Sequence, residues 1–389
     1  MTSLNLSNHP LFAKVVTFDV ETSTICKGSA FNEQNVLVMM QVKVGNTEPL
    51  IFTKENFNDA LDLLRTASCV VGTNLKFDLH WLQREFGVKV NCVWDLQIAE
   101  FLFSQQKWKY PDLATMCENY GVTKKLDVVK TEYWDKGLCT LDVPYEILAE
   151  YGAGDVNSTY EVFLKQVELF EQKYATMFKL FRLQCNDLLV LQEMEHSGIV
   201  YDVQASLDES ARLDKQLSHL EEKIYAYIGG VPLCLNSRDH ISALLYGGTI
   251  TEDTRVPIGV YKTGAKTGQT RFKIVEKAYE LPRLVQPLKG SELKKEGYFG
   301  TDESTLLSLK PTASIKKLLT WLLERSKIMK LKATYLEGLP KLIEEQGWKN
   351  GILYPNYNQC MAQTGRLSST RPNSQNLAPV AKSFCITRF

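Results

Sequence analysis

The chain has 389 residues, of which 44% are hydrophobic and 23% charged, and its 45 basic side chains balance 45 acidic ones. This composition is typical of a globular protein with two or three domains, and it excludes a disordered or fibrous chain. No apolar run reaches membrane-spanning length, and the N-terminus lacks a secretory signal pattern.

The nine cysteines and five histidines are scattered, and no C-x-x-C pair is present. An odd, unpatterned cysteine count favours reduced thiols over a disulfide framework or a zinc site. The sequence therefore predicts a cytoplasmic protein with no membrane association and no His/Cys metal centre.

The balanced net charge hides an asymmetry between the two parts of the chain. Residues 1–170 carry 15 Lys and Arg against 22 Asp and Glu, and the remainder carries 30 against 23. An acidic front part suits a site that collects cations, whereas a basic back part suits a phosphate backbone as partner.

The first 165 residues predict an α/β domain with a mixed sheet. Three strand patterns occur between residues 14 and 53, and a short buried strand is expected at 69–74. Amphipathic helices are expected around these strands, and from about Val143 a long helical stretch continues to about His196. The expected shorter helices cover residues 55–67, 77–87, 94–103 and 110–121.

The rest of the chain changes character twice. Residues 165–245 have helical patterns, and residues 247–300 are rich in Lys, Thr and Gly without helical periodicity. We interpret the latter as a basic, partly stranded projection. Helical patterns resume at 313–346, and residues 351–389 return to strand and loop.

The strand pattern at residues 15–25, "VVTFDVETSTI", carries two carboxylates two positions apart. On a strand, residues i and i+2 point to the same face, so Asp19 and Glu21 lie side by side and repel each other. Such a pair is explained by an exposed strand end or by a cation between the carboxylates.

Two further pairs are spaced four residues apart on predicted helices. Asn74 and Asp78 share one helical face, and so do Tyr151 and Asp155. Each residue alone has an ordinary alternative: Asp78 near a helix start is favoured by the helix dipole, Asp155 could be solvated, and Tyr151 could be a packing residue.

Together, the order D-x-E, N-x-x-x-D, Y-x-x-x-D over residues 10–165 resembles the DEDDy class of 3′→5′ exonucleases. The resemblance implies a ribonuclease H-like sheet on which Asp19, Glu21, Asp78 and Asp155 hold two divalent ions. Oxygen ligands favour Mg²⁺ or Mn²⁺. The resemblance also implies that Tyr151 aligns the attacking water.

The resemblance further implies a set of residues that bind the end of the DNA strand. Ile25 matches a position that wedges against the terminal base, and Asn74 and Phe77 match positions that hold the frayed 3′ end. For these three residues, a core or capping role is the alternative.

The back part of the chain resembles family A DNA polymerases, the bacterial DNA polymerase I class. "TGRLSSTRPNSQN" (364–376) is similar to the family's T-G-R-L-S-S-x-x-P-N-L-Q-N segment, and "MKLKATYLEGLP" (329–340) resembles a helix of its thumb. Ser374 replaces the family's leucine, and "NLAP" has one residue more than usual. These departures, with the basic segment 247–300, suggest a bacteriophage branch.

The resemblance implies three segments and a DNA-binding set. The segments are an exonuclease domain (1–165), a helical thumb (166–348) with the basic insert 247–300, and the beginning of a polymerase palm (349–389). Arg325 is displaced by one position from the family's arginine, so no role is transferred to it. The expected duplex-binding residues are Lys330, Lys332, Thr334, Arg366, Ser369, Asn373 and Gln375.

The family's palm aspartates and fingers do not match any part of this sequence. We therefore expect a proofreading exonuclease and thumb, acting on single-stranded 3′ ends and primer–template duplex, whose polymerase activity requires a second polypeptide carrying palm and fingers. A natural split gene and an experimental fragment both remain open. The alternative functions are a non-catalytic assembly subunit and a stand-alone ribonuclease D-like exonuclease.

Overall fold

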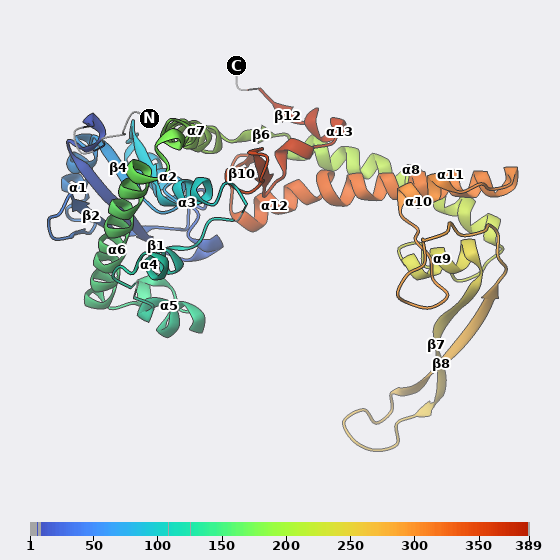
Figure 1. The fold of residues 1–389 in the computed structure, drawn as a ribbon. Helices are drawn as coiled ribbons and strands as arrows, with labels where there is room; N and C mark the ends of the chain where they lie inside the picture. The colour runs from blue at the N-terminus through green and yellow to red at the C-terminus, as the bar shows by residue number, and fades with distance from the viewer. Residues whose placement is uncertain (1–5, 7–8, 108, 125, 388–389) are drawn as a thin grey trace. The chain divides into compact units, whose positions relative to one another are not determined.

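The computed structural model describes residues 6, 9–107, 109–124 and 126–387 and contains two compact units (Figure 1). Unit 1 comprises residues 1–203 and 339–389, and unit 2 comprises residues 204–338. This division differs from the three expected segments. The physical reason is packing: Phe181, Cys185 and Leu188, which follow residue 165, are buried in the core of unit 1.

The centre of unit 1 is a five-stranded mixed sheet with the strand order β3-β2-β1-β4-β5. β1 pairs antiparallel with β2 and parallel with β4, which confirms the predicted mixed α/β sheet. One strand was not expected. A helix was predicted from residue 94, but Val93–Asp95 forms an edge strand parallel to β4 before the helix begins. The strands are β1 (Val15–Thr22), β2 (Leu37–Val44), β3 (Leu50–Phe52), β4 (Cys69–Gly72) and β5 (Val93–Asp95).

Helices pack around this sheet, and the long helix α6 contacts β1, β2 and β4 (Figure 1). The helical stretch expected from Val143 to His196 is broken at Lys173–Met177, so two helices form instead of one. Trp94 joins them to the sheet, since its indole packs against Phe163 of α6 and Phe181 of α7. The helices are α1 (Phe57–Arg65), α2 (Lys76–Phe86), α3 (Leu96–Phe103), α4 (Leu113–Tyr120), α5 (Val128–Glu132), α6 (Tyr145–Gln172) and α7 (Phe178–Ser197).

The chain re-enters unit 1 after unit 2. β6 (Ile199–Tyr201) is the middle strand of a small sheet between β9 (Ile352–Leu353) and β12 (Cys385–Ile386). Close approach requires glycine here, since a Cβ on Gly351 would lie 2.6 Å from the carbonyl oxygen of Tyr201. The remaining elements are α12 (Gly338–Gln346), β10 (Asn356–Asn358), β11 (Ser368–Thr370) and α13 (Pro379–Lys382).

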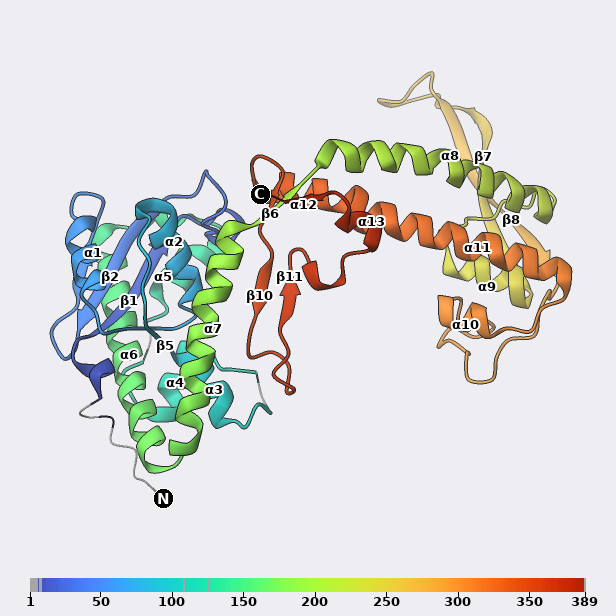
Figure 2. The same cartoon turned by 90° about the horizontal axis from the view of Figure 1, so that it is seen from above.

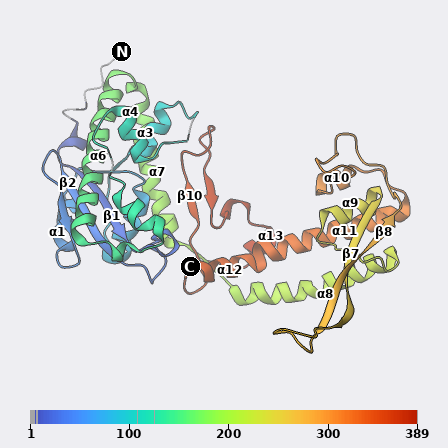
Figure 3. The ribbon, with the colours of Figure 1, turned by 90° about the horizontal axis from the view of Figure 1, so that it is seen from below.

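Unit 2 is mainly helical, and the helices α8 and α11 run side by side (Figures 2 and 3). A two-stranded antiparallel hairpin, β7–β8, projects from it and confirms the stranded character expected for residues 247–300. Buried Tyr246, Leu318 and Leu322 contribute to the core of this unit. Its elements are α8 (Val203–Ile228), α9 (Arg238–Tyr246), β7 (Gly248–Val260), β8 (Thr270–Leu281), α10 (Glu303–Ser308), α11 (Ala313–Leu331) and the π-turn η6 (Lys332–Leu336).

Among the helices in the described ranges, none combines the length and the apolar character needed to cross a bilayer.

Candidate active site

Three of the predicted carboxylates meet where α6 crosses β1. Each of Asp19, Glu21 and Asp155 offers a carboxylate oxygen, and these oxygens lie within 4.8 Å of one another. The alternation of β1 turns Asp19 and Glu21 toward the same face, and Asp155 approaches that face from α6. Glu21 is 6% and Asp155 4% exposed, so the exposed strand end considered for the D-x-E pair does not occur.

The fourth carboxylate reaches the same place from α2. Asp78 is 3% exposed, and its Oδ1 accepts a hydrogen bond of 3.1 Å from the backbone N–H of Val20, between the two β1 carboxylates. Burial, and secondarily the negative charge of Asp19, raise the pKa of Asp78 well above its ordinary value. A carboxyl group in this state gains from a nearby cation, which would favour its ionised form.

All four carboxylates and Tyr151 line one pocket of about 510 Å³. Its donor set consists of carboxylate oxygens, which are the ligands that Mg²⁺ and Mn²⁺ prefer. The residues present therefore fit a divalent metal centre, as the sequence predicted.

Tyr151 is buried, four residues before Asp155 on α6. Its ring packs edge-on against the indole of Trp134, with centroids 5.8 Å apart and planes at 83°. The indole Nε1 of Trp134 donates a 3.1 Å hydrogen bond to Oγ1 of Thr140. Trp134 and Thr140 also line the pocket, but they lie in short 3₁₀ turns that have no sequence pattern to single them out.

Asn74 and Phe77 line the pocket as predicted, but Asn74 lies outside the helix. α2 begins at Lys76, and Asn74 precedes it with a left-handed φ of +59°, a conformation that asparagine tolerates better than most residues. The expected helical pairing of Asn74 with Asp78 is therefore wrong, although the turn still brings both to the same pocket. Ile25 is 41% exposed and is not among the lining residues.

Asp95 holds this turn in place, and we did not predict that role from the sequence. Its Oδ2 accepts from the N–H of Leu75 at 2.8 Å, and its Oδ1 caps α3 by accepting from the N–H groups of Gln97 and Ile98. Burial raises the pKa of Asp95 to about 6. An Asp directly before a helical pattern is an N-cap signal, so the cap could have been found, but the bond to Leu75 could not.

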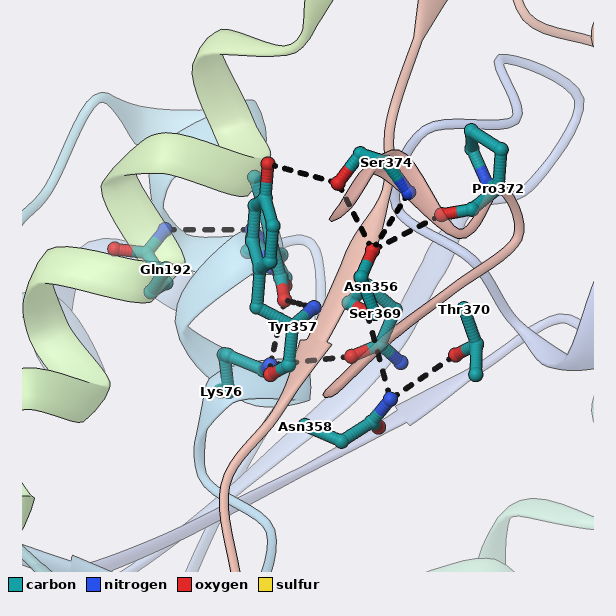
Figure 4. Close-up of polar contacts among 11 residues, drawn as sticks. Lys76, Gln192, Asn356, Tyr357, Asn358, Ser369, Thr370, Pro372 and Ser374 are labelled. Carbon is teal, nitrogen blue, oxygen red and sulfur yellow. Dashed lines mark hydrogen bonds and ion pairs between the residues drawn. The ribbon is translucent and has the colours of Figure 1, made fainter. Parts of the chain in front are cut away.

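A second buried cluster ties α2 to the C-terminal part of unit 1 (Figure 4). Lys76 Nζ lies 2.6 Å from Glu195 Oε1 and donates to Asn356 Oδ1 at 3.2 Å. The same Glu195 oxygen accepts from the N–H of Tyr357, and its other oxygen lies 2.8 Å from His80 Nε2. Burial lowers the pKa of His80 despite this carboxylate. The helix that carries Asp78 is thus joined through Lys76 to α7 and β10.

The cluster continues through hydroxyl groups into the polymerase-like segment. Ser374 Oγ donates to the hydroxyl of Tyr357 at 3.3 Å, and the N–H of Ser374 donates to Ser369 Oγ at 3.2 Å (Figure 4). Ser369 Oγ in turn donates to the carbonyl oxygen of Pro372 at 3.0 Å. Ser374, which departs from the family's leucine, is therefore used as a polar link within a turn.

Two of the predicted DNA-binding residues have other roles in the structure. Ser369 is 2% exposed, and its hydroxyl is engaged within the turn just described. Lys332 is also buried, and its ammonium group lies 2.7 Å from Asp214, 3.0 Å from Glu337 and 2.9 Å from the carbonyl oxygen of Ser210. Both assignments are corrected, because neither side chain presents a free polar group to a phosphate.

The other predicted DNA-binding residues are exposed but divide between the units. Arg366, Asn373 and Gln375 lie in unit 1, and Lys330 and Thr334 lie in unit 2. Arg325, to which no role was transferred, is buried and bonds to Glu221 at 2.7 Å and to Asn236 at 2.8 Å. It therefore stabilises the interior of unit 2.

Comparison with known families finds two matches along the chain. Residues 2–168 match the 3′–5′ exonuclease family of DNA polymerase A, and residues 281–384 match DNA polymerase family A. The first range contains the whole carboxylate pocket, and the second contains the segment around Ser369.

Similar proteins are DNA polymerases. The chain is 29% identical over 245 residues to DNA polymerase I of Chloroflexus aurantiacus and 28% identical over 275 residues to that of Bacillus subtilis, covering 62% and 69% of this chain. A DNA polymerase of Bacillus phage SP01 is 24% identical over 317 residues, covering 78% of this chain. The matched regions span only 22%, 25% and 33% of these relatives.

The fold also resembles a solved structure, the POL domain of Pol1 from M. smegmatis in complex with DNA primer-template and dNTP. The TM-score is 0.59 at 17% identity, over 97% of this chain and 55% of that one. The chain thus carries a 3′–5′ exonuclease domain of DNA polymerase A type at residues 2–168, followed by part of a family A DNA polymerase domain at residues 281–384.

Proposed function

We propose that the chain is a proofreading 3′→5′ exodeoxyribonuclease that releases nucleoside monophosphates from single-stranded DNA ends. The observation that carries this proposal is the pocket in which four buried or half-buried carboxylates and Tyr151 come together. Phosphodiester hydrolysis needs an activated water and a stabilised leaving oxygen. Two Mg²⁺ or Mn²⁺ ions, when bound, would supply the Lewis acidity for both needs.

The chain's own residues would bind and orient the reactants. Asp19, Glu21 and Asp155 would hold the ions through their clustered oxygens, and Asp78 would complete the set from α2. The hydroxyl of Tyr151 would orient the attacking water by hydrogen bonding, without itself losing a proton. Asn74 and Phe77 line the same pocket and would hold the 3′-terminal nucleotides. Exposed Ile25 would wedge against the terminal base.

The double variant Asp19→Ala/Glu21→Ala tests this site. We expect release of monophosphates from 3′-labelled single-stranded DNA to fall to background, with unchanged circular dichroism. EDTA should stop the unaltered protein, and Mg²⁺ or Mn²⁺ should restore it. Full activity of the folded double variant would refute the site. A single-stranded RNA substrate tests the ribonuclease D-like alternative, and a metal-loaded protein that degrades neither strand would leave the assembly-subunit alternative.

We also propose that residues 165–389 bind duplex DNA, and that a second polypeptide carrying palm and fingers supplies polymerase activity. Support for the duplex role is the basic balance of this region and the exposure of Lys330, Thr334, Arg366, Asn373 and Gln375. Support for the second polypeptide is β12, an edge strand whose Ile386 is half exposed and whose outer backbone groups offer a template for another strand. Primer extension that appears only after mixing with a palm-and-fingers fragment tests it, and well-folded fragments that neither co-elute nor extend a primer would contradict it.

A further inference from the structure

The distal half of the β7–β8 hairpin has a charge distribution that differs from the rest of unit 2. Between Thr254 and Val275 there are five basic residues and no acidic one. These basic residues are exposed, and within the described part of the chain none of them forms an ion pair. They are Arg255, Lys262, Lys266, Arg271 and Lys273.

The proximal half of the same hairpin is acidic, with four acidic residues (Glu252, Asp253, Glu276 and Glu280) against one basic residue, Lys277. Glu252 is paired across the strands with Lys277, and its carboxylate accepts a 3.2 Å hydrogen bond from the hydroxyl of Tyr279. Lys277 lies over the ring of Tyr279, 4.7 Å from the centroid. The uncompensated positive charge is therefore confined to the segment beyond the Asp253–Glu276 pair, and is not a property of the hairpin as a whole.

The distal half also exposes apolar side chains on both faces of the ribbon. Ile274 is 60% and Phe272 52% exposed, on the face that Arg255 shares, while half-exposed Val256 lies opposite Lys273 on the other face. A two-stranded ribbon with both faces in water is marginally stable by itself. Its length and its exposed apolar groups indicate that this segment works against another surface.

The surface that matches this chemistry is a duplex nucleic acid. A two-stranded ribbon fits the major groove of B-DNA, cationic side chains bind the phosphates along its rims, and exposed apolar side chains can contact sugars and base edges. We propose that residues 254–275 form a DNA-binding arm that lies in a groove of the duplex and holds it without sequence preference. This inference extends the duplex binding proposed above to named residues and does not depend on the hydrolytic pocket.

Fluorescence anisotropy with a 20-base-pair duplex in EDTA tests the arm without interference from hydrolysis. The variant Arg255→Gln/Lys262→Gln/Lys266→Gln/Arg271→Gln/Lys273→Gln removes its charge. If all five cations contact phosphates, the slope of log K against log [salt] should become shallower by roughly 4 to 5, and affinity near 0.1 M salt should fall at least about tenfold. Hydrolysis of a short single-stranded oligonucleotide should be unchanged.

A matched control removes the same charge from other exposed, unpaired lysines of unit 2, in the variant Lys215→Gln/Lys223→Gln/Lys289→Gln/Lys294→Gln/Lys316→Gln. A smaller loss in the control supports the arm, whereas an equal loss in both variants means that only overall charge matters and overturns it. A shortened hairpin, in which Asn-Gly joins the paired residues Asp253 and Glu276, provides a second test. If it keeps full duplex affinity and slope, the ribbon serves a different partner, such as a protein, and the proposal is wrong.

Discussion

Burial, as much as residue type, gives the carboxylate pocket its chemistry. Asp78 and Asp155 are almost fully buried, so each ionised carboxylate carries a desolvation cost that a bound cation offsets. Tyr151 is buried and its ring packs edge-on against the indole of Trp134, which restricts the ring before substrate arrives. The pocket is thus organised by packing, and small changes in that packing should affect hydrolysis.

Gly152 offers the sharpest test of this packing. A methyl group at Gly152 would lie 2.3 Å from Nε2 of Gln41, which is fully buried on β2 opposite Asp19. We expect Gly152→Ala to displace α6 from the sheet, and with it Tyr151 and Asp155, lowering the hydrolysis rate about tenfold or more because small displacements of catalytic groups are costly.

Gly154 provides the control on the same helix. A methyl group there would meet only Leu126, at an ordinary 3.4 Å, so Gly154→Ala should leave the rate unchanged and stabilise α6 by about 1 kcal/mol. Single-turnover hydrolysis and thermal unfolding measure both effects. Equal rates for the two variants would mean that the fit of Gln41 against α6 does not position the site.

The raised pKa of Asp95 should make the unfolding free energy of the protein depend on pH. The pKa of Asp95 in the folded protein, about 6, exceeds its ordinary value, so the carboxylate binds a proton more tightly in the folded state than in the unfolded state. This contribution to stability is fully present below about pH 4 and is lost as pH rises through about 6, by roughly 3 kcal/mol for two pKa units.

The variant Asp95→Asn keeps one oxygen to cap Gln97 and Ile98, loses the acceptor for the N–H of Leu75, and cannot titrate. The lost bond lowers its unfolding free energy by an amount that does not depend on pH. Relative to the unaltered protein, the unfolding free energy of the variant should therefore rise as pH increases from 4 to 7. Urea unfolding followed by tryptophan fluorescence measures this difference. A difference that stays constant over this range would contradict the assigned titration.

Residue spacing explains which of the site residues could be predicted from the sequence. Asp19 with Glu21 and Tyr151 with Asp155 are set by the periods of a strand and a helix, so their joint approach was predictable. The role of Trp134 and the bond of Asp95 to Leu75 were not, because they depend on tertiary contacts that leave no local pattern in the sequence. Lys332 and Ser369 were predicted to bind DNA from motif similarity, but both are buried and bonded inside the fold. Motif similarity does not show whether a polar group already has a partner within the protein.

The element that links the two ends of unit 1 is α2. It presents Asp78 to the pocket, and two residues earlier Lys76 is anchored to Glu195 of α7 and to β10. Glu195 is nearly inaccessible, and its carboxylate forms hydrogen bonds with Lys76, His80 and the N–H of Tyr357. A carboxylate with three partners fixes the relative position of three elements more firmly than any single contact.

Glu195→Gln should therefore weaken unit 1. Loss of one charge of a buried pair leaves Lys76 uncompensated and should cost about 3 kcal/mol in unfolding free energy, with slower hydrolysis as α2 shifts. Glu193→Gln is the matched control, because its ion pair with Lys89 is largely exposed and should contribute less than about 1 kcal/mol. Chemical denaturation compares the two, and equal stability would argue against an anchoring role for Glu195.

The whole molecule is an interleaved arrangement, with unit 2 inserted between two parts of unit 1. The mixed sheet and the stranded character of the hairpin agreed with the patterns in the sequence. The division into units did not, because hydrophobic periodicity identifies a helix such as α7 without saying which core it joins. The short strands β9 and β12 lie within residues 351–389, where strand and loop were expected, but their pairing with β6 was not predicted, because it joins segments far apart in the chain.

This arrangement predicts that the exonuclease depends on distant residues. A fragment of residues 1–203 should be less stable and less active than the full chain, since β6 would lose both neighbouring strands and Glu195 its bond to Tyr357. A variant in which a Gly/Ser linker of about twelve residues replaces residues 204–338 should retain hydrolysis. Melting temperatures and hydrolysis rates distinguish them, and equal behaviour would mean that residues 339–389 are dispensable for the site.

The interleaving also sets an order of events during synthesis. The ribosome releases the five-stranded sheet and α7 first, then all of unit 2, and only afterwards the strands that flank β6. Until then Glu195 and Lys76 have each other but not β10. Early folding of unit 2 would shorten the loop that the last strands must close, which reduces the entropy cost of closure. The hydrolytic pocket would therefore form early in translation, and the hydrogen bond from Lys76 of α2 to Asn356 of β10 would form last.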